Sequence, residues 1–238
     1  MDLEISGRRA AVAAGTSGLG LGTAKALAAE GVAVAICGRD RARLDAAVAA
    51  VGHGCVGIVQ DVASAAGGQA FVDAAIEALG GVDILVTNAG GPPPGTFSST
   101  DVDRYPSAIE LNLMSVIGMC KAAVDPMLER GWGRVVAITS VAVRQPIPQL
   151  ILSNTARAGA TGFLKTLALE VADRGVTVNS VQPGTHRTPR SAALDDTNVR
   201  MGDPDDFGAI VAFVCSARTA FLTGAHISVD GGAYKALL

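Results

Sequence analysis

Short apolar runs alternate with alanine-rich stretches along this chain. The run from Ile84 to Val86 contains no polar residue, which is typical of a strand buried on both faces of a sheet. Strands are expected over residues 9–14, 32–37, 56–60, 82–87, 134–139, 176–181 and 225–229, and helices over 18–30, 41–51, 69–79, 102–130, 153–172 and 205–216. This repeated order predicts an α/β fold, a doubly wound parallel sheet of about seven strands with helices on both faces.

Proline marks the interruptions of this pattern. Three prolines over 92–94 predict a loop, because they can neither donate to a strand ladder nor sit inside a helix. Pro126 is expected to kink or shorten the far end of the helix over 102–130. The segment from about 185 to 203 is polar and interrupted by proline, which predicts a flexible flap. Nothing marks a boundary or an internal repeat, so residues 1–238 are expected to form a single domain.

Composition narrows the class of protein. A hydrophobic fraction of 49% with 17% charged residues indicates a well-buried globular domain, and a net charge of -3 offers no basic surface for nucleic acid. No apolar run approaches the roughly 20 residues that span a bilayer, and the acidic start Met1-Asp2-Leu3-Glu4 does not resemble a signal peptide. We therefore expect a cytoplasmic location and no membrane partner. The four cysteines lie in apolar runs and the three histidines are scattered, which predicts buried free thiols and no metal site.

The clearest candidate binding site follows the first expected strand. The small residues over 13–20 let the backbone approach a pyrophosphate, and the helix that begins at Gly18 offers N–H donors and a positive dipole. Three more segments close expected strands: Asp61-Val62, Asn88-Ala89-Gly90, and Pro183-Gly184 followed by Thr188. Open α/β sheets bind ligands at the carboxyl ends of their strands, so this arrangement is typical of a Rossmann-type dinucleotide site.

These segments resemble those of the short-chain dehydrogenase/reductase family. The turn is similar to the family's TGxxxGxG, with Gly18 and Gly20 on its last two glycines. Asn88-Ala89-Gly90 matches the family's NAG motif. Pro183-Gly184 with Thr188 matches its PGxxxT motif, whose threonine contacts the nicotinamide amide. Residues 221–224 and 229–232 match the family's closing segment. The likeness covers essentially the whole chain. It implies a nicotinamide cofactor held by Gly15, Ser17, Gly18, Leu19, Gly20, Arg39, Asp61, Val62, Asn88, Ala89, Gly90, Arg157, Pro183, Gly184 and Thr188.

Two positions bear on the fit of that cofactor. Ala14 places a methyl group where the family has glycine, so we expect the cofactor to fit if the φ angle of Ala14 stays negative, with Gly15 as compensation. Arg39 follows the second strand, where a carboxylate would bind the ribose 2′-hydroxyl of NAD and an arginine pairs with the 2′-phosphate of NADP. NADP is therefore favoured over NAD. The alternative is that Arg39 is an ordinary solvated charge.

The expected catalytic residues differ from those of the family more than the expected cofactor-binding residues do. Ser140 ends the fifth strand and matches the family's catalytic serine, and Asn112 matches its catalytic asparagine. Ser153 and Arg157 stand where the family has the tyrosine and lysine of its YxxxK motif, and the stretch over 162–170 anchors this register. The resemblance therefore implies a catalytic set of four residues, two of which match in position and differ in identity.

These substitutions change the proton chemistry. In the family the tyrosine phenol, with an ordinary pKa of about 10 that the lysine lowers, protonates the alkoxide left by hydride transfer. The hydroxyl of Ser153 is a weaker acid on a shorter side chain. Arg157 keeps the positive charge and can fork hydrogen bonds onto ribose hydroxyls, but it does not release a proton near neutrality. Ser140 and Ser153 can still polarise a carbonyl, and Asn112 can hold a water that delivers the proton.

Plainer interpretations stand beside these roles. Ser153 can be the N-cap of the helix that it precedes, Arg157 a surface charge, and Asn112 a structural residue inside a helix. Arg144, in the loop after the fifth strand, is a candidate ligand for a substrate carboxylate, phosphate or carbonyl, or else a solvated arginine. His186 is a candidate substitute acid at the substrate site, or else an exposed loop residue.

Three hypotheses on function follow. The leading one is an NADP-dependent reductase of small-molecule carbonyl substrates, free or linked to an acyl carrier, in an atypical branch similar to β-ketoacyl-carrier-protein reductases. The second is a cofactor-binding protein with little redox activity, acting as a sensor or partner subunit. The third is a cyclase, dehydratase or isomerase that uses the same pocket for polarisation. The resemblance also implies a homotetramer or homodimer, in which the helices over 102–130 and 153–172 pair across a twofold axis.

Overall fold

The computed structural model describes residues 1–194 and 200–237. Its sheet consists, in spatial order, of β3 (Val56–Val59), β2 (Ala33–Gly38), β1 (Arg9–Val12), β4 (Ile84–Thr87), β5 (Gly133–Ile138), β6 (Val176–Pro183) and β7 (His226–Val229). Every neighbouring pair of these strands is parallel. The order reverses between β1 and β4, so the carboxyl ends of these strands flank a crevice. The predicted doubly wound parallel sheet is confirmed.

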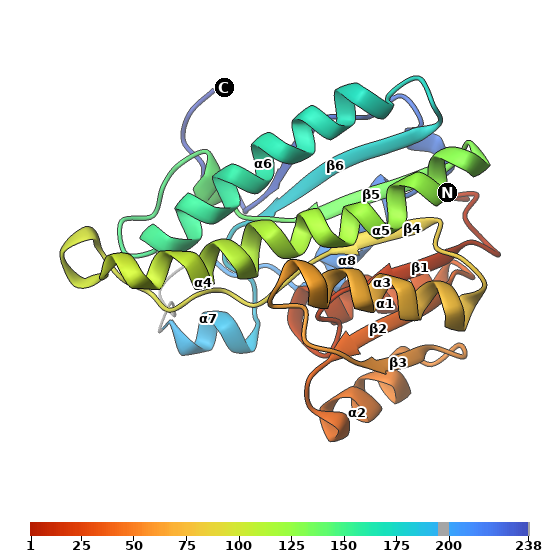
Figure 1. Cartoon of the computed structure of the whole chain (residues 1–238), viewed down its shortest axis with the longest axis horizontal. Coiled ribbons are helices and arrows are strands. Elements are labelled where there is room, and N and C mark those ends of the chain that lie inside the picture. The colour runs from red at the N-terminus through yellow and green to blue at the C-terminus, as the bar shows by residue number, and fades with distance from the viewer. Residues whose placement is uncertain (195–199, 238) are drawn as a thin grey trace.

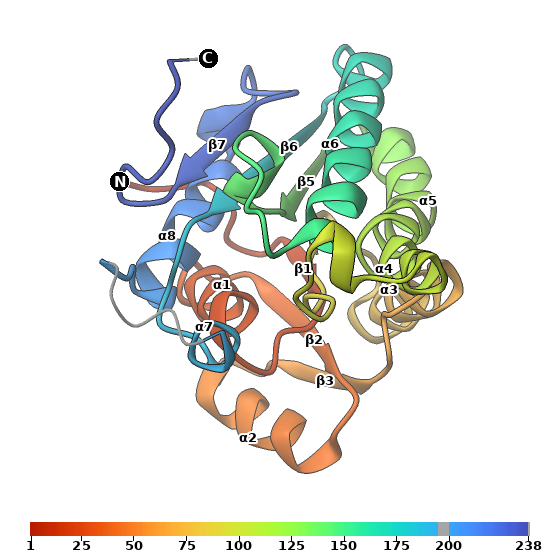
Figure 2. The ribbon, with the colours of Figure 1, turned by 90° about the vertical axis from the view of Figure 1, so that its left-hand side faces the viewer.

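Helices cover both faces of the sheet (Figures 1 and 2). One layer contains α1 (Gly18–Ala29), α2 (Arg41–Val51) and α8 (Pro204–Val214), and the other contains α3 (Ala65–Leu79), α5 (Ser115–Arg130) and α6 (Ile151–Val171). The short helices α4 (Tyr105–Ile109) and α7 (Pro189–Ala193) follow β4 and β6 and lie at the left-hand end of the molecule in Figure 1.

Successive strand residues face two different hydrophobic cores. Val12 and Ile36 pack into a core shared with Phe207 of α8, while Ala11 and Leu85 pack into a core shared with Phe71 of α3. All six side chains are buried. Burial on both faces explains the apolar strand sequences, because neither face needs polar side chains. The four cysteines lie in these cores as free thiols, as predicted.

The backbones of α1 and α8 are in direct contact. A Cβ atom on Gly22 would overlap the carbonyl oxygen of Pro204, and a Cβ atom on Gly208 would overlap the carbonyl oxygen of Gly22. Only glycine permits two helices to approach so closely. The contact fixes the start of α8 against the helix that follows the glycine-rich turn.

Two helices begin earlier than expected. α3 starts at Ala65 and not at residue 69, because Ser64 caps it by accepting a hydrogen bond from Gly67 N at 3.1 Å. The two glycines in its first turn hide the helical pattern. α6 starts at Ile151 and not at residue 153.

Pro126 lies inside α5 and does not end it. The helix continues to Arg130 and stops at Gly131, which has a φ angle of 65°. The expected shortening is therefore wrong. Met127 is buried in the core one residue after the proline, and this packing keeps the last turn helical despite the missing N–H group.

The stretch expected as one helix over 102–130 is built from four segments. A 3₁₀ turn (Val102–Arg104), α4, a π-helical turn (Glu110–Met114) and α5 follow one another. This stretch has the length and mean hydropathy, 1.3, of a membrane-spanning helix, and 50% of its most apolar window is buried inside the fold. The sequence expectation rested on uninterrupted apolar runs, which are shorter than a membrane-spanning helix. It therefore did not include this stretch.

The expected flap contains a helix that the pattern did not reveal. Thr188 caps α7 and Pro189 occupies its first turn, an arrangement that favours helix initiation. Residues 195–199, in the middle of the expected flap, lie outside the described residues.

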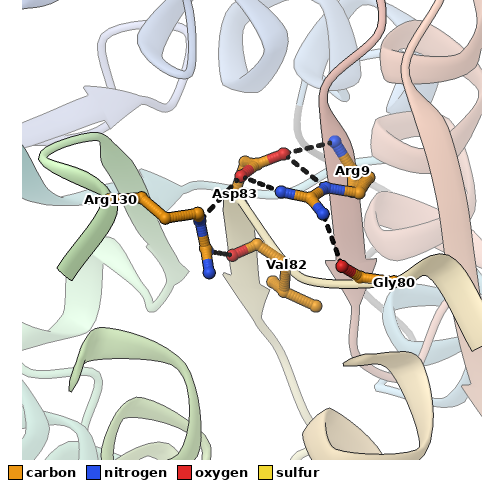
Figure 3. Close-up of polar contacts among 5 residues, drawn as sticks. All are labelled: Arg9, Gly80, Val82, Asp83 and Arg130. Atoms are coloured by element: carbon orange, nitrogen blue, oxygen red, sulfur yellow. Dashed lines mark hydrogen bonds and ion pairs between the residues drawn. The ribbon is translucent and has the colours of Figure 1, made fainter. Parts of the chain in front are cut away.

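A buried carboxylate joins three elements at the amino ends of the strands (Figure 3). Asp83, just before β4, accepts hydrogen bonds from Arg9 Nε at 2.8 Å and Arg9 Nη2 at 2.7 Å, and Arg130 Nε lies 3.4 Å from its Oδ1. The same arginines donate to the carbonyl oxygens of Gly80 and Val82. Burial by itself would raise the pKa of Asp83, but the hydrogen bonds and charge of Arg9, with the charge of Arg130, hold that pKa below its usual value.

Asp83→Asn is expected to destabilise the fold at pH 7 by about 2 kcal/mol, below the range for fully buried pairs because both arginines are partly exposed. A lowered folded-state pKa stabilises the fold above the unfolded-state value of about 4, and this contribution is lost as the pH falls through the folded-state pKa. The difference in unfolding free energy between the wild type and Asp83→Asn, measured in urea, should therefore shrink below about pH 4. Asp45→Asn, which removes an exposed pair with Arg41, should cost under about 0.5 kcal/mol. Equal deficits in the two variants would contradict this account.

Candidate active site

The turn between β1 and α1 is closed by contacts with the neighbouring strands. Gly15 N donates to the carbonyl oxygen of Cys37 at 3.1 Å, and Asn88 Nδ2 donates to the carbonyl oxygen of Ala14 at 3.4 Å. A Cβ atom on Gly20 would lie 2.5 Å from Ala14 O and 2.9 Å from Asn88 Nδ2. A larger residue at position 20 would push the helix away from the turn, so glycine is required there.

Ala14 adopts the left-handed backbone region, with a φ angle of 47°. The condition of a negative φ angle is therefore not met, and Gly15 does not compensate, since its own φ angle is not positive. The N–H of Ala14 donates to Cys37 Sγ at 3.3 Å, so contacts with β2 hold the conformation. An L-residue in this region costs about 1–2 kcal/mol. The turn thus keeps a glycine-type backbone and stores strain at Ala14.

The first turn of α1 is open to a phosphate group. Ser17 occupies the N-cap position, but its side chain makes no hydrogen bond to the helix, so the first N–H groups have no side-chain partner. Thr188 lies beside this turn, because a Cβ atom on Gly18 would be 3.1 Å from Thr188 Cγ2. The structure therefore brings the glycine-rich turn and the PGxxxT segment together. These residues fit a dinucleotide diphosphate, whose charge helix N–H groups and the helix dipole stabilise.

The remaining expected cofactor positions lie along the same edge of the sheet. Arg39 follows β2 and Asp61 follows β3, and their side chains, 76% and 53% exposed, approach to 3.8 Å. Such an exposed pair contributes little to stability and leaves the guanidinium accessible. Val62 is buried, Leu19 packs partly buried against the first core, Ala89 and Gly90 follow β4, and Pro183 and Gly184 end β6.

Asn112 lies in the π-helical turn between α4 and α5. Its Nδ2 donates to the carbonyl oxygen of Gly90 at 2.9 Å, and its buried Oδ1 has no hydrogen-bond partner in the described chain. A π-helical turn adds one residue to a helical turn and frequently occurs at functional sites. Here it places the amide group of Asn112 beside the segment that follows β4.

Ser153 sits in the first turn of α6, and the N-cap position belongs to Leu150. The N-cap interpretation of Ser153 is therefore wrong. Its side chain is buried. Ser140, after β5, accepts a hydrogen bond from Ala142 N at 3.1 Å, which leaves the hydroxyl proton of Ser140 available to a ligand.

Arg157 lies one helical turn after Ser153 and points inward. Its Nη1 donates to the carbonyl oxygen of Ile138 in β5 at 3.0 Å, so it is not a surface charge. Burial, and then the positive charge of Arg190, lower the pKa of Arg157 to about 10, which leaves the guanidinium charged at neutral pH.

Arg190 of α7 is a site residue that the motifs did not reveal. Its Nη2 donates to the carbonyl oxygen of Pro92 at 2.8 Å, and its Nη1 lies 3.5 Å from the carbonyl oxygen of Gly91. Burial lowers the pKa of Arg190. It stands two residues after the PGxxxT threonine, and only the folded chain shows that its charge acts on Arg157.

Two expected substrate residues make other contacts. Arg144 Nη2 donates to the carbonyl oxygen of His226 at 2.8 Å, and its guanidinium lies 5.5 Å from the centre of the Tyr234 ring. His186 is only 5% exposed, so the expectation of an exposed loop residue is wrong. Its Nδ1 lies 3.1 Å from the carbonyl oxygen of Gly184, and its ring packs edge-to-face on Phe207. Contacts outside the catalytic set therefore account for both side chains.

Comparison with known proteins assigns the family. Residues 8–199 match the family described as short chain dehydrogenase. This chain belongs to the short-chain dehydrogenase family. It is 34% identical to dehydrogenase/reductase SDR family member 4 of Oryctolagus cuniculus, over 96% of this chain and 94% of that one. It is 31% identical to the 3-oxoacyl-acyl-carrier-protein reductase FabG of Vibrio cholerae, over 98% and 99% of the two chains.

Solved structures are also similar to this chain. A short chain oxidoreductase from Pseudomonas aeruginosa PAO1, described as containing an atypical catalytic center and solved with NADPH bound, has a TM-score of 0.90 and 30% identity over 98% of this chain and 99% of that one.

Ala14→Gly is expected to stabilise the fold by about 0.5–1 kcal/mol, because relief of about 1–2 kcal/mol of strain outweighs the added unfolded-state entropy of about 0.4–1 kcal/mol. Denaturant unfolding measures the difference. The matched control is Ala13→Gly, at a buried neighbour without a positive φ angle, which should destabilise the fold by about 1 kcal/mol. Destabilisation by both variants would show that Ala14 carries no strain.

Proposed function

We propose that this short-chain dehydrogenase transfers a hydride between NADP(H) and a carbonyl or alcohol substrate, in the manner of β-ketoacyl and ketone reductases. One observation carries the proposal: the chain joins the glycine-rich turn to Asn88, and Asn112 to Gly90, around the carboxyl ends of β1 and β4. The reductase name of the Vibrio cholerae relative and the NADPH in the Pseudomonas aeruginosa structure support the reaction class and the cofactor.

The choice of NADP rests on Arg39. Its side chain is 76% exposed and only loosely paired with Asp61, so it can turn onto a 2′-phosphate without breaking a strong contact. A phosphate carries more charge than the Asp61 carboxylate and offers more acceptor oxygens. We therefore expect NADPH to bind more tightly than NADH.

Two serine hydroxyls are available to the substrate carbonyl. Ser153 is buried in the first turn of α6, and Ser140 Oγ accepts from Ala142 N while its own proton remains available. Donors aimed at the carbonyl oxygen stabilise the negative charge that develops there during reduction. NADPH, when bound, supplies the hydride that reduces the carbonyl carbon.

The proton for the resulting oxygen has to come from outside the Ser153–Arg157 pair. A serine hydroxyl is too weak an acid, and Arg157 stays charged at neutral pH. Asn112 Oδ1 is a buried acceptor without a partner in the described residues, which suits a bound water that passes a proton to the substrate oxygen. Arg157 then acts as a fixed positive charge that orients ribose hydroxyls.

The double variant Ser153→Tyr, Arg157→Lys tests this division of roles. A positioned general acid contributes about 10²–10⁴-fold to rate, so the double variant is expected to raise kcat on a ketone by at least about tenfold. Stopped-flow absorbance of the nicotinamide measures it. Ser153→Phe with Arg157→Lys is the matched control, because it adds the ring without the acidic hydroxyl. The same gain in both variants would show that the proton does not limit the rate.

Arg39→Asp is expected to lower the affinity for NADPH by about 10–100-fold and to leave the affinity for NADH within about threefold, since it replaces a phosphate partner by a repelling carboxylate. Fluorescence titration of both cofactors measures the two constants. Arg43→Asp, on the exposed side of α2, controls for the change in net charge. A parallel loss of both cofactors would remove Arg39 from the 2′-phosphate site.

A ketone panel decides whether the protein is a reductase. Fluorescence titration first establishes NADPH binding, and turnover is then followed at the nicotinamide absorbance. Tight binding with no turnover on any ketone would make the chain a cofactor-binding protein without redox activity. Absence of NADPH binding would leave only a non-redox reaction.

The expected association of two or four copies stays a prediction. α5 and α6 border a groove of about 140 Å³ lined in part by Leu128, Phe163 and Leu167, and Leu169 nearby is 73% exposed. A second copy would cover this apolar surface.

A further inference from the structure

The side chain of Arg190 links α7, which follows β6, to the loop that follows β4. Its guanidinium contacts the carbonyl oxygens of Gly91 and Pro92 in that loop. This loop continues directly from Asn88-Ala89-Gly90, which contacts both the glycine-rich turn and Asn112. Arg190 therefore contacts the loop that continues from the segment holding Asn112.

Among the described residues, neither Arg157 nor Arg190 has a carboxylate oxygen within 4.0 Å, whereas Arg9, Arg39, Arg41, Arg130, Arg187 and Arg218 each have one. The buried Arg134 also has none, but carbonyl oxygens and the Trp132 ring surround its guanidinium. The contacts of Arg190 are fewer, and its positive charge acts on Arg157, so an anion bound at Arg190 would offset that repulsion.

The contacts of Arg190 can be exchanged for a ligand. A guanidinium carries five N–H donors, and Arg190 uses only two of its nitrogens, one of them at the long distance of 3.5 Å. Its planar fork matches the two oxygens of a carboxylate. Neutral carbonyl acceptors, such as those of Gly91 and Pro92, bind a guanidinium less strongly than a carboxylate does.

We propose that Arg190, with the charge of Arg157, binds a carboxylate on the substrate, so that the preferred substrates are oxo acids. This inference rests on the proposed reductase function and names its substrate class. The reacting ketone lies at Ser140 and Ser153, and the acid group of the same molecule lies under α7. Arg190 is then the residue that determines substrate specificity.

The test compares two compounds that differ in one charge. 3-Oxobutanoate and its methyl ester carry the same reacting ketone, and turnover of both is followed with NADPH. The wild-type protein should have a higher kcat/KM for the acid. Arg190→Gln should lower the acid-to-ester ratio of kcat/KM by about ten- to a hundredfold, the value of a charge-assisted hydrogen bond. Arg190→Lys keeps the charge and should recover part of that ratio.

Arg174→Gln is the matched control. Arg174 lies just before β6, at the edge of the sheet opposite the crevice, and its side chain is exposed. Arg174→Gln changes the net charge by the same amount as Arg190→Gln and should leave the acid-to-ester ratio of kcat/KM unchanged. An unchanged ratio in Arg190→Gln would overturn the inference, and a loss of NADPH affinity at an unchanged ratio would assign Arg190 to the cofactor.

A binding measurement separates this inference from the proposed function. The NADP⁺ complex cannot reduce a ketone, so the shift of its Tm by 3-oxobutanoate reports binding alone. A shift in the wild type that Arg190→Gln abolishes supports the carboxylate site even if no compound is reduced, in which case only the reductase function fails. Turnover of the ester without any preference for the acid, and no Tm shift, would reject the carboxylate site and leave the reductase function standing.

Discussion

The close approach between the turn after β1 and the first residues of α1 positions the rest of the site. Gly20 lies against Ala14 O and Asn88 Nδ2, so the turn, the first helix and the end of β4 are held as one unit. The same segment of β4 then holds Asn112 through the carbonyl oxygen of Gly90. A single backbone contact thus connects the region that fits a diphosphate to the region that fits the reacting groups. Movement at Gly20 would disturb both.

Compared with a tyrosine and a lysine, Ser153 and Arg157 keep a positive charge but lack an acidic group. A tyrosine and a lysine would together provide an acidic group and a cation that tunes it. Ser153 and Arg157 provide a neutral donor and a cation that stays charged, and Arg190 adds a second positive charge to the same crevice. Under the proposed function, a site with this balance is better suited to orienting an anionic molecule than to supplying a proton quickly, and the proton is expected to come from a water held at Asn112.

Local patterns predicted the sheet, most helices and the position of every motif, because strand burial, helix periodicity and motif spacing are properties of short segments. The remaining features depend on contacts between distant segments. The positive φ angle of Ala14 is held by Cys37, and the burial of His186 depends on Phe207 of α8. The π-helical turn at Asn112 and the placement of Arg190 beside Pro92 also arise only in the folded chain. A motif locates such residues without showing their partners.

The glycine contact between α1 and α8 has a consequence for how this fold can diversify. Gly22 meets Pro204 where α8 begins, and Gly18 meets Thr188 just before α7. Both ends of the segment over 189–203 are therefore anchored on the same helix, the one that carries the glycine-rich turn. A described residue between these anchors, such as Arg190 in α7, can therefore be substituted while the glycine-rich turn keeps its place. The two anchors separate the part of the chain where substrate preference is proposed to reside from the part that fits the cofactor.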